Sequence, residues 1–516
     1  MSARHPGSHL DFCVIDSSST ARPNALWKTR KSRCDPRSLP GWLLVMGAAC
    51  LAAATGVAAQ QAPDRSKPPA LGPLPALTLP PVEKRTLSNG LQVWIMGIHK
   101  VPTVHLSLTI RAGIAADPPG KFGLASLTAD MLDEGAGTRN ALEIADAVDF
   151  LGAELSATGA TDASYVDLHV PVARLADALP IMADLIARPT FPETELKRLR
   201  EERLASLLEM EDDPEELIQA AFPRLVFGAT HRYGTGSMGT GASLKAITAA
   251  DLKAFHAAQY RPANAVLVVA GDVTADAIVP QLEKALGQWK GAPGAKPATA
   301  GDAAQLTARQ VFLIDKPDAA QSQIRIGWIG AARSTPDYFA LRVLNTILGE
   351  AFTSRLNNNL REVHGYAYGA SSRFDMRLSA GAFYASAGVQ TDKTADALKE
   401  FFIELTRIHE PIPADELEKA KNYLALQLPR TFETTRGTAN ALAQTYLYDL
   451  PADYYATYAA RVRAVTAADV KRAADKYIQP GKFAVVIVGD RKIIEPGVKA
   501  LNLGPMTVVQ SGEVFK

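Results

Sequence analysis

The 516-residue sequence contains little cysteine and almost no net charge. Its three cysteines, Cys13, Cys34 and Cys50, all lie near the N-terminus, so the chain after residue 50 folds without disulfides and without thiolate metal ligands. The 55 Lys and Arg residues balance 54 Asp and Glu residues, and a net charge of +1 gives no electrostatic footprint for nucleic acid. With 47% hydrophobic and 21% charged residues, most of the chain is expected to be globular, with room for two or three domains.

Only one long uncharged run is evident, and it lies in the N-terminal segment. Seven basic residues precede the run Gly41–Ala59, which ends in the small residues Val57-Ala58-Ala59. This pattern is typical of a secretory signal peptide. The run is also just long enough to span a membrane, so a retained N-terminal anchor stays open as an alternative. We predict a signal peptide with a long polar leader over residues 1–59, a periplasmic location, and a flexible Pro- and Ala-rich tether over residues 60–81.

One sequence unit occurs twice. The segment Lys245–Lys253 recurs 218 positions later as Arg463–Lys471, and the same offset relates Val266–Asp272 to Ala484–Asp490. A period of this length indicates a duplicated domain rather than a solenoid. The Gly-, Pro- and Ala-rich stretch Gly291–Gly301 between the copies is typical of a linker. The predicted organisation is an N-terminal domain over 82–290, a linker over 291–308 and a C-terminal domain over 309–510.

Strand and helix patterns alternate within each copy. Apolar residues follow helical spacing over Leu124–Leu132 and Leu196–Leu208, and Thr190 followed by Glu193 predicts a capping box at the start of the second helix. Short apolar runs predict strands, and two of them end in Gly-Asp, as buried strands followed by a turn do. The sequence therefore predicts two α+β domains in tandem, each with its own sheet; the expected strands are Gln92–Met96, His105–Arg111, Val266–Ala270, Gln310–Ile314, Gln323–Trp328 and Val485–Val488.

Four segments, taken in their order and spacing, carry a family resemblance: Gly123-Leu-Ala125, Glu209–Pro214, Tyr260–Asp272 and Ser354–Tyr368. They are similar to the pitrilysin/insulinase family of zinc metallopeptidases, in particular its short two-domain bacterial and mitochondrial-processing-peptidase-like branch. The resemblance runs from about Leu79 to near the C-terminus. It implies two tandem homologous domains, each a mostly antiparallel sheet covered by helices, that face each other across a cavity. It also implies that two chains usually pair to form a chamber.

The zinc motif of that family is missing from this sequence. Family catalysts carry His-x-x-Glu-His on a helix, where the two imidazoles share one face and reach one zinc, the Glu handles the attacking water, and a Glu further along completes the ligands. The resemblance places Ser126, Ala129 and Asp130 at the His, Glu and His positions, and Ala205 and Ser206 where the distal Glu belongs. No two histidines after the leader are three or four positions apart. We expect no catalytic zinc on this chain, while a ligand set assembled from distant residues remains the alternative.

A second element of the family pattern is retained. The resemblance implies an Arg and a Tyr, seven positions apart, that hold the substrate near the scissile peptide, and these match Arg361 and Tyr368. A guanidinium can donate forked hydrogen bonds to a peptide carbonyl, and a phenol that donates to the developing oxyanion is typically worth about 2.7–4 kcal/mol. The alternative is an Arg paired with a nearby acid and a Tyr buried on the following strand. The resemblance also places Leu155–Gly159 where family members offer an edge strand to an extended substrate, and ordinary sheet structure is the equal alternative for this segment.

Loss of the zinc positions together with retention of the Arg/Tyr pair favours one function over two others. We expect a non-catalytic subunit of a heterodimeric pitrilysin-type zinc protease, whose homologous partner subunit carries the zinc and cleaves peptides or unfolded chains. One alternative is a catalytically inert periplasmic peptide-binding or scaffold protein. The other is a stand-alone metalloendopeptidase with unorthodox ligands.

Overall fold

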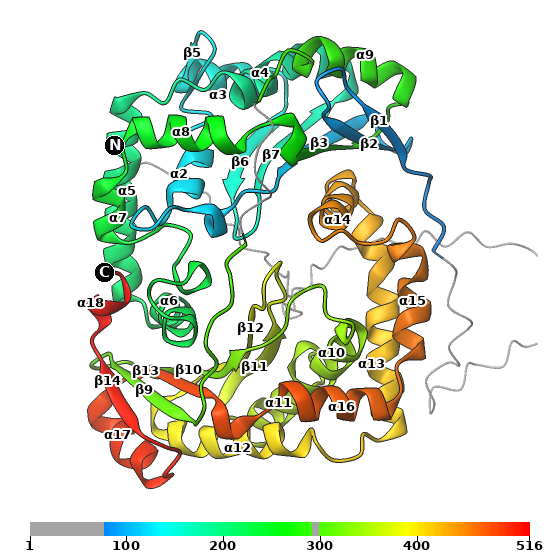
Figure 1. Cartoon of the computed structure of the whole chain (residues 1–516). Helices are drawn as coiled ribbons and strands as arrows, with labels where there is room; N and C mark the ends of the chain where they lie inside the picture. The colour runs from blue at the N-terminus through cyan, green and yellow to red at the C-terminus, as the bar shows by residue number, and fades with distance from the viewer. Residues whose placement is uncertain (1–76, 292–298) are drawn as a thin grey trace, which may run out of the picture. The chain divides into compact units, whose positions relative to one another are not determined.

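The computed structural model describes residues 77–291 and 299–516 (Figure 1). The predicted signal peptide and most of the predicted tether lie outside these residues, as does part of the predicted linker. All described residues belong to one structural unit. Within them, every helix is too short or too polar to cross a membrane.

The first sheet has six strands in the order β1-β2-β8-β3-β7-β6. Strands β2 and β8 run parallel, and the other neighbours run antiparallel. A separate two-stranded ribbon pairs β4 with β5. The strands are β1 (Glu83–Thr86), β2 (Gln92–Gly97), β3 (Thr103–Ile110), β4 (Gly135–Ala136), β5 (Arg139–Asn140), β6 (Glu154–Gly159), β7 (Ser164–Pro171) and β8 (Ala265–Gly271).

The second sheet has the order β11-β12-β10-β13-β9-β14. Read from β9 to β11, its strands repeat the neighbour order found from β2 to β6 in the first sheet, as the sequence duplication predicts. Both sheets are mostly antiparallel, so the predicted α+β fold with two homologous halves is confirmed. The strands are β9 (Gln310–Asp315), β10 (Gln321–Ile329), β11 (Ala367–Phe374), β12 (Ala382–Gln390), β13 (Ala484–Gly489) and β14 (Met506–Val509).

Helices cover both sheets (Figure 1). In the first half they are α2 (Leu124–Asp130), α3 (Ala141–Phe150), α4 (Leu175–Ala187), α5 (Glu193–Asp212), α6 (Pro214–Phe227), α7 (Gly241–Ala246), α8 (Ala249–Gln259) and α9 (Ala275–Leu286). In the second half they are α10 (Tyr338–Asn345), α11 (Arg355–Asn357), α12 (Thr394–Arg407), α13 (Ala414–Gln427), α14 (Thr435–Leu447), α15 (Tyr454–Ala464), α16 (Ala467–Tyr477), α17 (Arg491–Ala500) and α18 (Ser511–Val514), with π-helical turns η5 (Thr346–Glu350) and η6 (Asn358–Val363).

The repeated sequence segment builds the same local structure in both halves. Thr248 caps α8 and Thr466 caps α16, each through a capping box with the Asp three residues later. The capping box predicted for α5 is wrong. The N-cap of α5 is Pro192, whose ring has no polar atom that could accept a hydrogen bond from the helix. The Thr190 backbone N–H instead donates to the Gly135 carbonyl of β4.

The two halves exchange one helix each. On α6, Leu217 and Phe222 are buried in a hydrophobic cluster with alternate residues of β13, such as Val486, although α6 belongs to the first half. On α14, Leu442 packs in the same way against β2 and β8 of the first sheet, including Val268. The opposite faces of β8 and β13 contact helices of their own half. Both strands are therefore buried on two faces, which explains their continuous apolar sequences.

Candidate functional site

Helix α2 carries the positions at which the family's zinc motif was expected, and a buried carboxyl fixes its N-terminus. The backbone N–H groups of Gly123 and Ala125 donate to the two carboxyl oxygens of Asp117 at 2.7 and 2.8 Å. Gly123 itself has φ +87°, and a Cβ there would come within 2.6 Å of the Met238 carbonyl oxygen, so only glycine fits. Burial raises the pKa of Asp117 to about 7, against the opposing effect of these two N–H donors.

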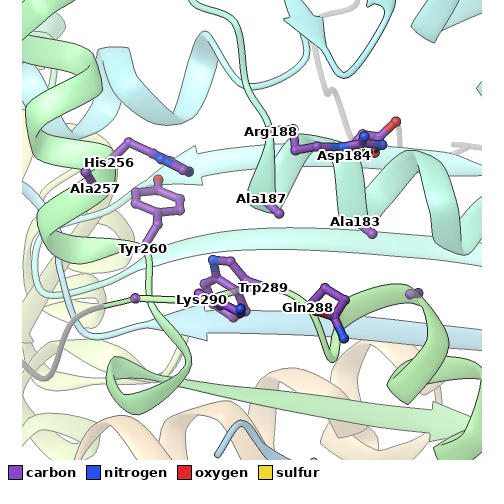
Figure 2. A pocket seen from close by; sticks show the side chains of 12 residues that line it. Ala183, Asp184, Ala187, Arg188, His256, Ala257, Tyr260, Gln288, Trp289 and Lys290 are labelled. Atoms are coloured by element: carbon purple, nitrogen blue, oxygen red, sulfur yellow. Dashed lines mark hydrogen bonds and ion pairs between the residues drawn. The ribbon is translucent and has the colours of Figure 1, made fainter. Parts of the chain in front are cut away.

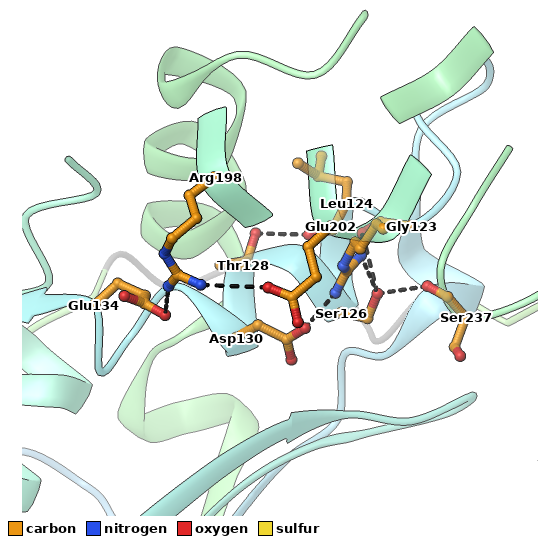
Figure 3. Close-up of polar contacts among 10 residues, drawn as sticks. Gly123, Leu124, Ser126, Thr128, Asp130, Glu134, Arg198, Glu202 and Ser237 are labelled. Carbon is orange, nitrogen blue, oxygen red and sulfur yellow. Dashed lines mark hydrogen bonds and ion pairs between the residues drawn. The ribbon is translucent and has the colours of Figure 1, made fainter. Parts of the chain in front are cut away.

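An arginine occupies the position between the two residues that would have to bind zinc. Arg203 of α5 donates to the Asp130 carboxylate at 2.5 Å and to the Ser126 hydroxyl at 3.1 Å; Figure 3 labels Asp130 and Ser126. The Arg203 side chain is only 8% exposed, whereas Asp130 is 41% exposed. The Ser126 hydroxyl in turn donates to the Ser237 carbonyl. The charge at this place is therefore a fixed guanidinium, which does not lose its proton in proteins.

Acidic side chains near α2 also form ion pairs. Arg198 of α5 forms ion pairs with Glu134 and, at 3.3 Å, with Glu202 (Figure 3). It also pairs with Glu195 at 2.7 Å. These groups form a partly exposed ion-pair network on the surface of the helix, in which three carboxylates share one guanidinium. The network gives the carboxylates a structural partner in place of a metal.

The residues at the expected zinc positions do not fit a zinc ion. Ala129 and Ala205 have no donor atom, and the single carboxylate, Asp130, already binds a guanidinium that repels a dication. Across residues 77–291 and 299–516, no group of three or more His, Cys, Asp and Glu side chains could hold a metal ion. His256 is a packed residue: its Nε2 lies 2.9 Å from the Ile186 carbonyl oxygen.

The structure brings Arg361 and Tyr368 together. Arg361 lies on the π-helical turn η6, and its Cζ is 5.2 Å from the ring centre of Tyr368 on β11 and 4.6 Å from that of Phe352. Tyr368 is 89% exposed and Phe352 is 64% exposed. The alternative of a tyrosine buried on the strand is therefore wrong. Arg361 does have a nearby acid, Glu362, at 3.4 Å, but the guanidinium still stacks against two exposed rings.

A bulge in β11 determines where Tyr368 points. Ala367 pairs with Val389 of β12, and Ala370 pairs with Ala387, so three steps on β11 match two on β12. Ala367 and Ala370 both face the helices of the second half, which leaves Tyr368 and its neighbour on the opposite, open face. An extra residue re-aims a side chain in this way. Without the bulge, Tyr368 would alternate into the core.

The segment expected as an edge strand is at the edge of the first sheet. Among the described residues, strand β6 pairs only with β7, so one row of its backbone groups has no partner strand there. Its last residue, Gly159, packs directly on α2: a Cβ there would come within 2.5 Å of the Ser126 Cα atom. The free edge therefore ends beside Ser126, one of the expected zinc positions.

Comparisons with known proteins identify the family. Residues 93–235 match the sequence model described as "Insulinase (Peptidase family M16)", and residues 246–424 match "Peptidase M16 inactive domain". The chain belongs to the insulinase family of peptidases. Among curated relatives, an uncharacterized zinc protease of Mycobacterium leprae is 28% identical over 318 residues, which are 61% of this chain and 71% of the relative.

Two further matches are a curated relative named as a peptidase subunit and a solved structure of a peptidase M16 domain. A probable mitochondrial-processing peptidase subunit beta of Arabidopsis thaliana is 24% identical over 430 residues, covering 80% of this chain and 79% of that protein. The crystal structure of a peptidase M16 inactive domain from Pseudomonas fluorescens aligns with a TM-score of 0.74 and 26% identity, covering 80% of this chain and 98% of that one. The family resemblance found in the sequence is confirmed.

Sequence reasoning missed Arg203 and Asp117 of this insulinase-family site. Arg203 could have been found, because it lies seven residues after Leu196 and four before Leu207, on the buried face of α5. A charged residue on an otherwise apolar helix face indicates a buried partner. Asp117 carries no comparable signal, because its contacts with Gly123 and Ala125 come from a loop.

A separate pocket of about 740 Å³ lies between α4, α8 and the end of α9 (Figure 2). His256, Tyr260 and Trp289 line it, and all of the expected site residues lie elsewhere. The ring of His256 stacks on Tyr260 at 4.8 Å between ring centres. Burial lowers the pKa of His256, so its imidazole is neutral near pH 7 and packs as an uncharged ring.

Proposed function

We propose that this insulinase-family chain is the non-catalytic subunit of a two-chain zinc protease. Arg361 and Tyr368 bind the substrate in this proposal, and a homologous partner subunit carries the zinc and the general base. The substrates are peptides or unfolded chains. The predicted signal peptide leads us to propose the periplasm as the compartment in which the two subunits meet.

The observation that carries this proposal is the contrast between the two sites. At the zinc positions, a buried guanidinium is bound to Ser126 and Asp130, so that this place is closed to a cation. On the second sheet, Arg361 and an 89% exposed Tyr368 are stacked and accessible. A chain that had simply lost its activity would have no reason to keep an exposed aromatic pair with a stacked guanidinium.

The chemistry of the pair suits a supporting role in peptide cleavage. The guanidinium of Arg361 can donate two hydrogen bonds to a peptide carbonyl, and the phenol of Tyr368 can donate one to the oxygen that becomes negative during hydrolysis. Neither group can generate the nucleophile. One relative is named as the beta subunit of a processing peptidase, which supports an assembly of more than one chain.

The test is reconstitution. The purified chain is mixed with a same-compartment homologue that has an intact His-x-x-Glu-His motif, and cleavage of a fluorogenic peptide is followed. We expect activity above that of the homologue alone. We expect Tyr368→Phe to lower kcat by roughly 100-fold, the typical effect of losing one oxyanion donor, and Arg361→Ala to raise KM as well.

Two matched variants control for general effects. Tyr366→Phe removes a hydroxyl two positions away, and Arg463→Ala removes an exposed arginine from α15; both should leave the stimulated activity unchanged. If mixing gives no stimulation, the complementing role is wrong, and the alternative of an inert peptide-binding or scaffold protein is favoured. If the chain alone copurifies with stoichiometric zinc and cleaves the peptide, it is a stand-alone enzyme with unorthodox ligands.

A further inference from the structure

A pocket of about 780 Å³ lies at the β11 edge of the second sheet, and several positively charged side chains line it. We call it the arginine pocket, because four arginines line it: Arg325, Arg333, Arg342 and Arg373. Its volume lies within the range of sites that bind small ligands or a few residues of a peptide. Helix α10 forms one wall, and the exchanged helix α14 contributes another through Gln444.

The acids of the arginine pocket are already neutralised. The pocket is lined by two carboxylates, Glu350 and Asp375. Glu350 binds Arg342 at 2.6 Å, and Asp375 binds Arg377 at 2.7 Å. The positive charges of the remaining lining arginines are therefore not cancelled from within the pocket.

Three lining arginines, Arg325, Arg333 and Arg373, have no carboxylate within ion-pair distance among the described residues. Arg333 is held by a hydrogen bond to the Tyr454 hydroxyl at 2.7 Å, which does not neutralise it. Arg373 is exposed on β11. Three guanidinium groups on one concave surface repel each other and favour the entry of an anion.

Arg325 is the most constrained of the three. Its Cζ lies 4.5 Å from the ring centre of Tyr384 and 5.8 Å from that of Phe222 on the exchanged helix α6, so aromatic rings hold its position. Its Nε atom is buried and has no hydrogen-bond partner in the described chain. Burial lowers the pKa of Arg325; the charges of Tyr384 and Glu215 oppose this effect, and the charge of Arg373 adds to it. A buried charged donor without a partner is costly, and a carboxylate would relieve that cost.

The arginine pocket reaches around the edge strand β11, and two of its arginines, Arg325 and Arg373, lie on the same face of the sheet as Tyr368. Ser371 and Arg373 alternate along β11 on the open face, to which the bulge also turns Tyr368. Arg325 pairs with Ser386 across β10 and β12, and Ser386 pairs with Ser371. A peptide that contacts Tyr368 and follows β11 would reach the arginine pocket within a few residues, since strands rise about 3.3 Å per residue.

We propose that the arginine pocket binds the side-chain carboxylates of an acidic peptide segment next to the bond that Arg361 and Tyr368 hold. This inference deepens the proposed function and rests on it for the link to cleavage. The binding step itself requires only this chain. It assigns a preference for Asp- or Glu-containing substrates to the non-catalytic subunit.

Fluorescence anisotropy on the chain alone tests the inference. The probe is a short fluorescein-labelled peptide with two adjacent glutamates, and the matched probe carries glutamines instead. We expect the glutamate peptide to bind at least about tenfold more tightly at low salt, and this preference to shrink as salt rises. Arg325→Gln and Arg373→Gln should each abolish most of the preference, while Arg463→Gln, an exposed arginine of the same half, should not change it.

The outcomes separate this inference from the proposed function. Equal binding of the two peptides, or a preference that survives in both pocket variants, overturns it, whatever the reconstitution assay gives. Binding of inorganic phosphate without a preference for the glutamate peptide also overturns it, because the pocket would then take free oxyanions. Arg373→Gln changes an exposed side chain and should unfold like the wild-type chain, so a loss of preference in that variant cannot come from misfolding.

Discussion

Removing either partner of the Arg203–Asp130 pair should destabilise the protein by unequal amounts. Truncating one member of a buried ion pair typically costs about 3–5 kcal/mol, because the other charge is left without compensation. Arg203 is 8% exposed, but Asp130 is 41% exposed. Asp130→Ala therefore strands a buried guanidinium that keeps only the Ser126 hydroxyl and the more distant Gly123 carbonyl at 3.4 Å.

For Asp130→Ala we expect a loss of about 3 kcal/mol in the free energy of unfolding. For Arg203→Met we expect only about 1–2 kcal/mol, because water can solvate the half-exposed carboxylate and the methionine fills the space of the arginine stem. The double variant should be more stable than Asp130→Ala alone, since neither charge of the pair is then left without its partner.

Urea unfolding followed by tryptophan fluorescence measures these differences, compared at equal m-values. Lys471→Met is the control: it breaks an ion pair with Asp475 at 2.8 Å in which both side chains are about half exposed, and it should cost no more than about 0.5 kcal/mol. If Arg203→Met costs as much as Asp130→Ala, or if the two changes are additive, the guanidinium is not the constrained member of the pair and our account of the closed zinc position fails.

Two further predictions concern pH and the exchanged helices. Because the folded-state pKa of Asp117 is raised from 3.8 to about 7, its protonation favours the folded state; this contribution is complete below pH 4 and is lost as pH rises to about 7. Relative to Asp117→Asn, the wild-type chain should lose up to about 4 kcal/mol over that interval in chemical denaturation, and parallel pH profiles would contradict the assignment. Phe222→Ala on α6 and Leu442→Ala on α14 should each cost about 3–5 kcal/mol within one unfolding transition, whereas Phe150→Ala, at an 80% exposed position, should cost almost nothing. Two separate calorimetric transitions would show that the halves unfold independently.

Much of the fold could be predicted because its signals are local. The strands at Val266–Ala270 and Val485–Val488 are continuous apolar runs, and the structure extends each by one residue at both ends. The duplication predicted that the two Thr-x-x-Asp segments occupy equivalent positions in the two halves, and both segments form capping boxes. The same kind of signal misled at Thr190, because Pro192 begins α5 directly and the threonine backbone pairs with β4 instead.

The features that could not be predicted depend on contacts between distant residues. The apolar face of α6 indicates that it must be covered, but it does not specify which of two similar sheets covers it. The contact of Arg203 with the expected zinc positions requires that α5 cross α2 at Ser126 and Asp130, which no local pattern encodes. The open orientation of Tyr368 depends on one extra residue in β11, and a bulge of that kind is invisible until the pairing with β12 is known.

The exchanged helices have a consequence for how the chain can be divided. A fragment that ended between the copies would keep α6 with nothing to cover, and its own sheet would present Trp94, Met96 and Val268 to water. Each fragment alone should aggregate, whereas the two produced together should reassemble, because each supplies the cover that the other lacks. A protease that cuts the chain between the two copies should therefore leave a nicked molecule whose halves stay together until it is denatured. By the same reasoning, one copy of the duplicated sequence is smaller than the smallest piece of this chain that can fold.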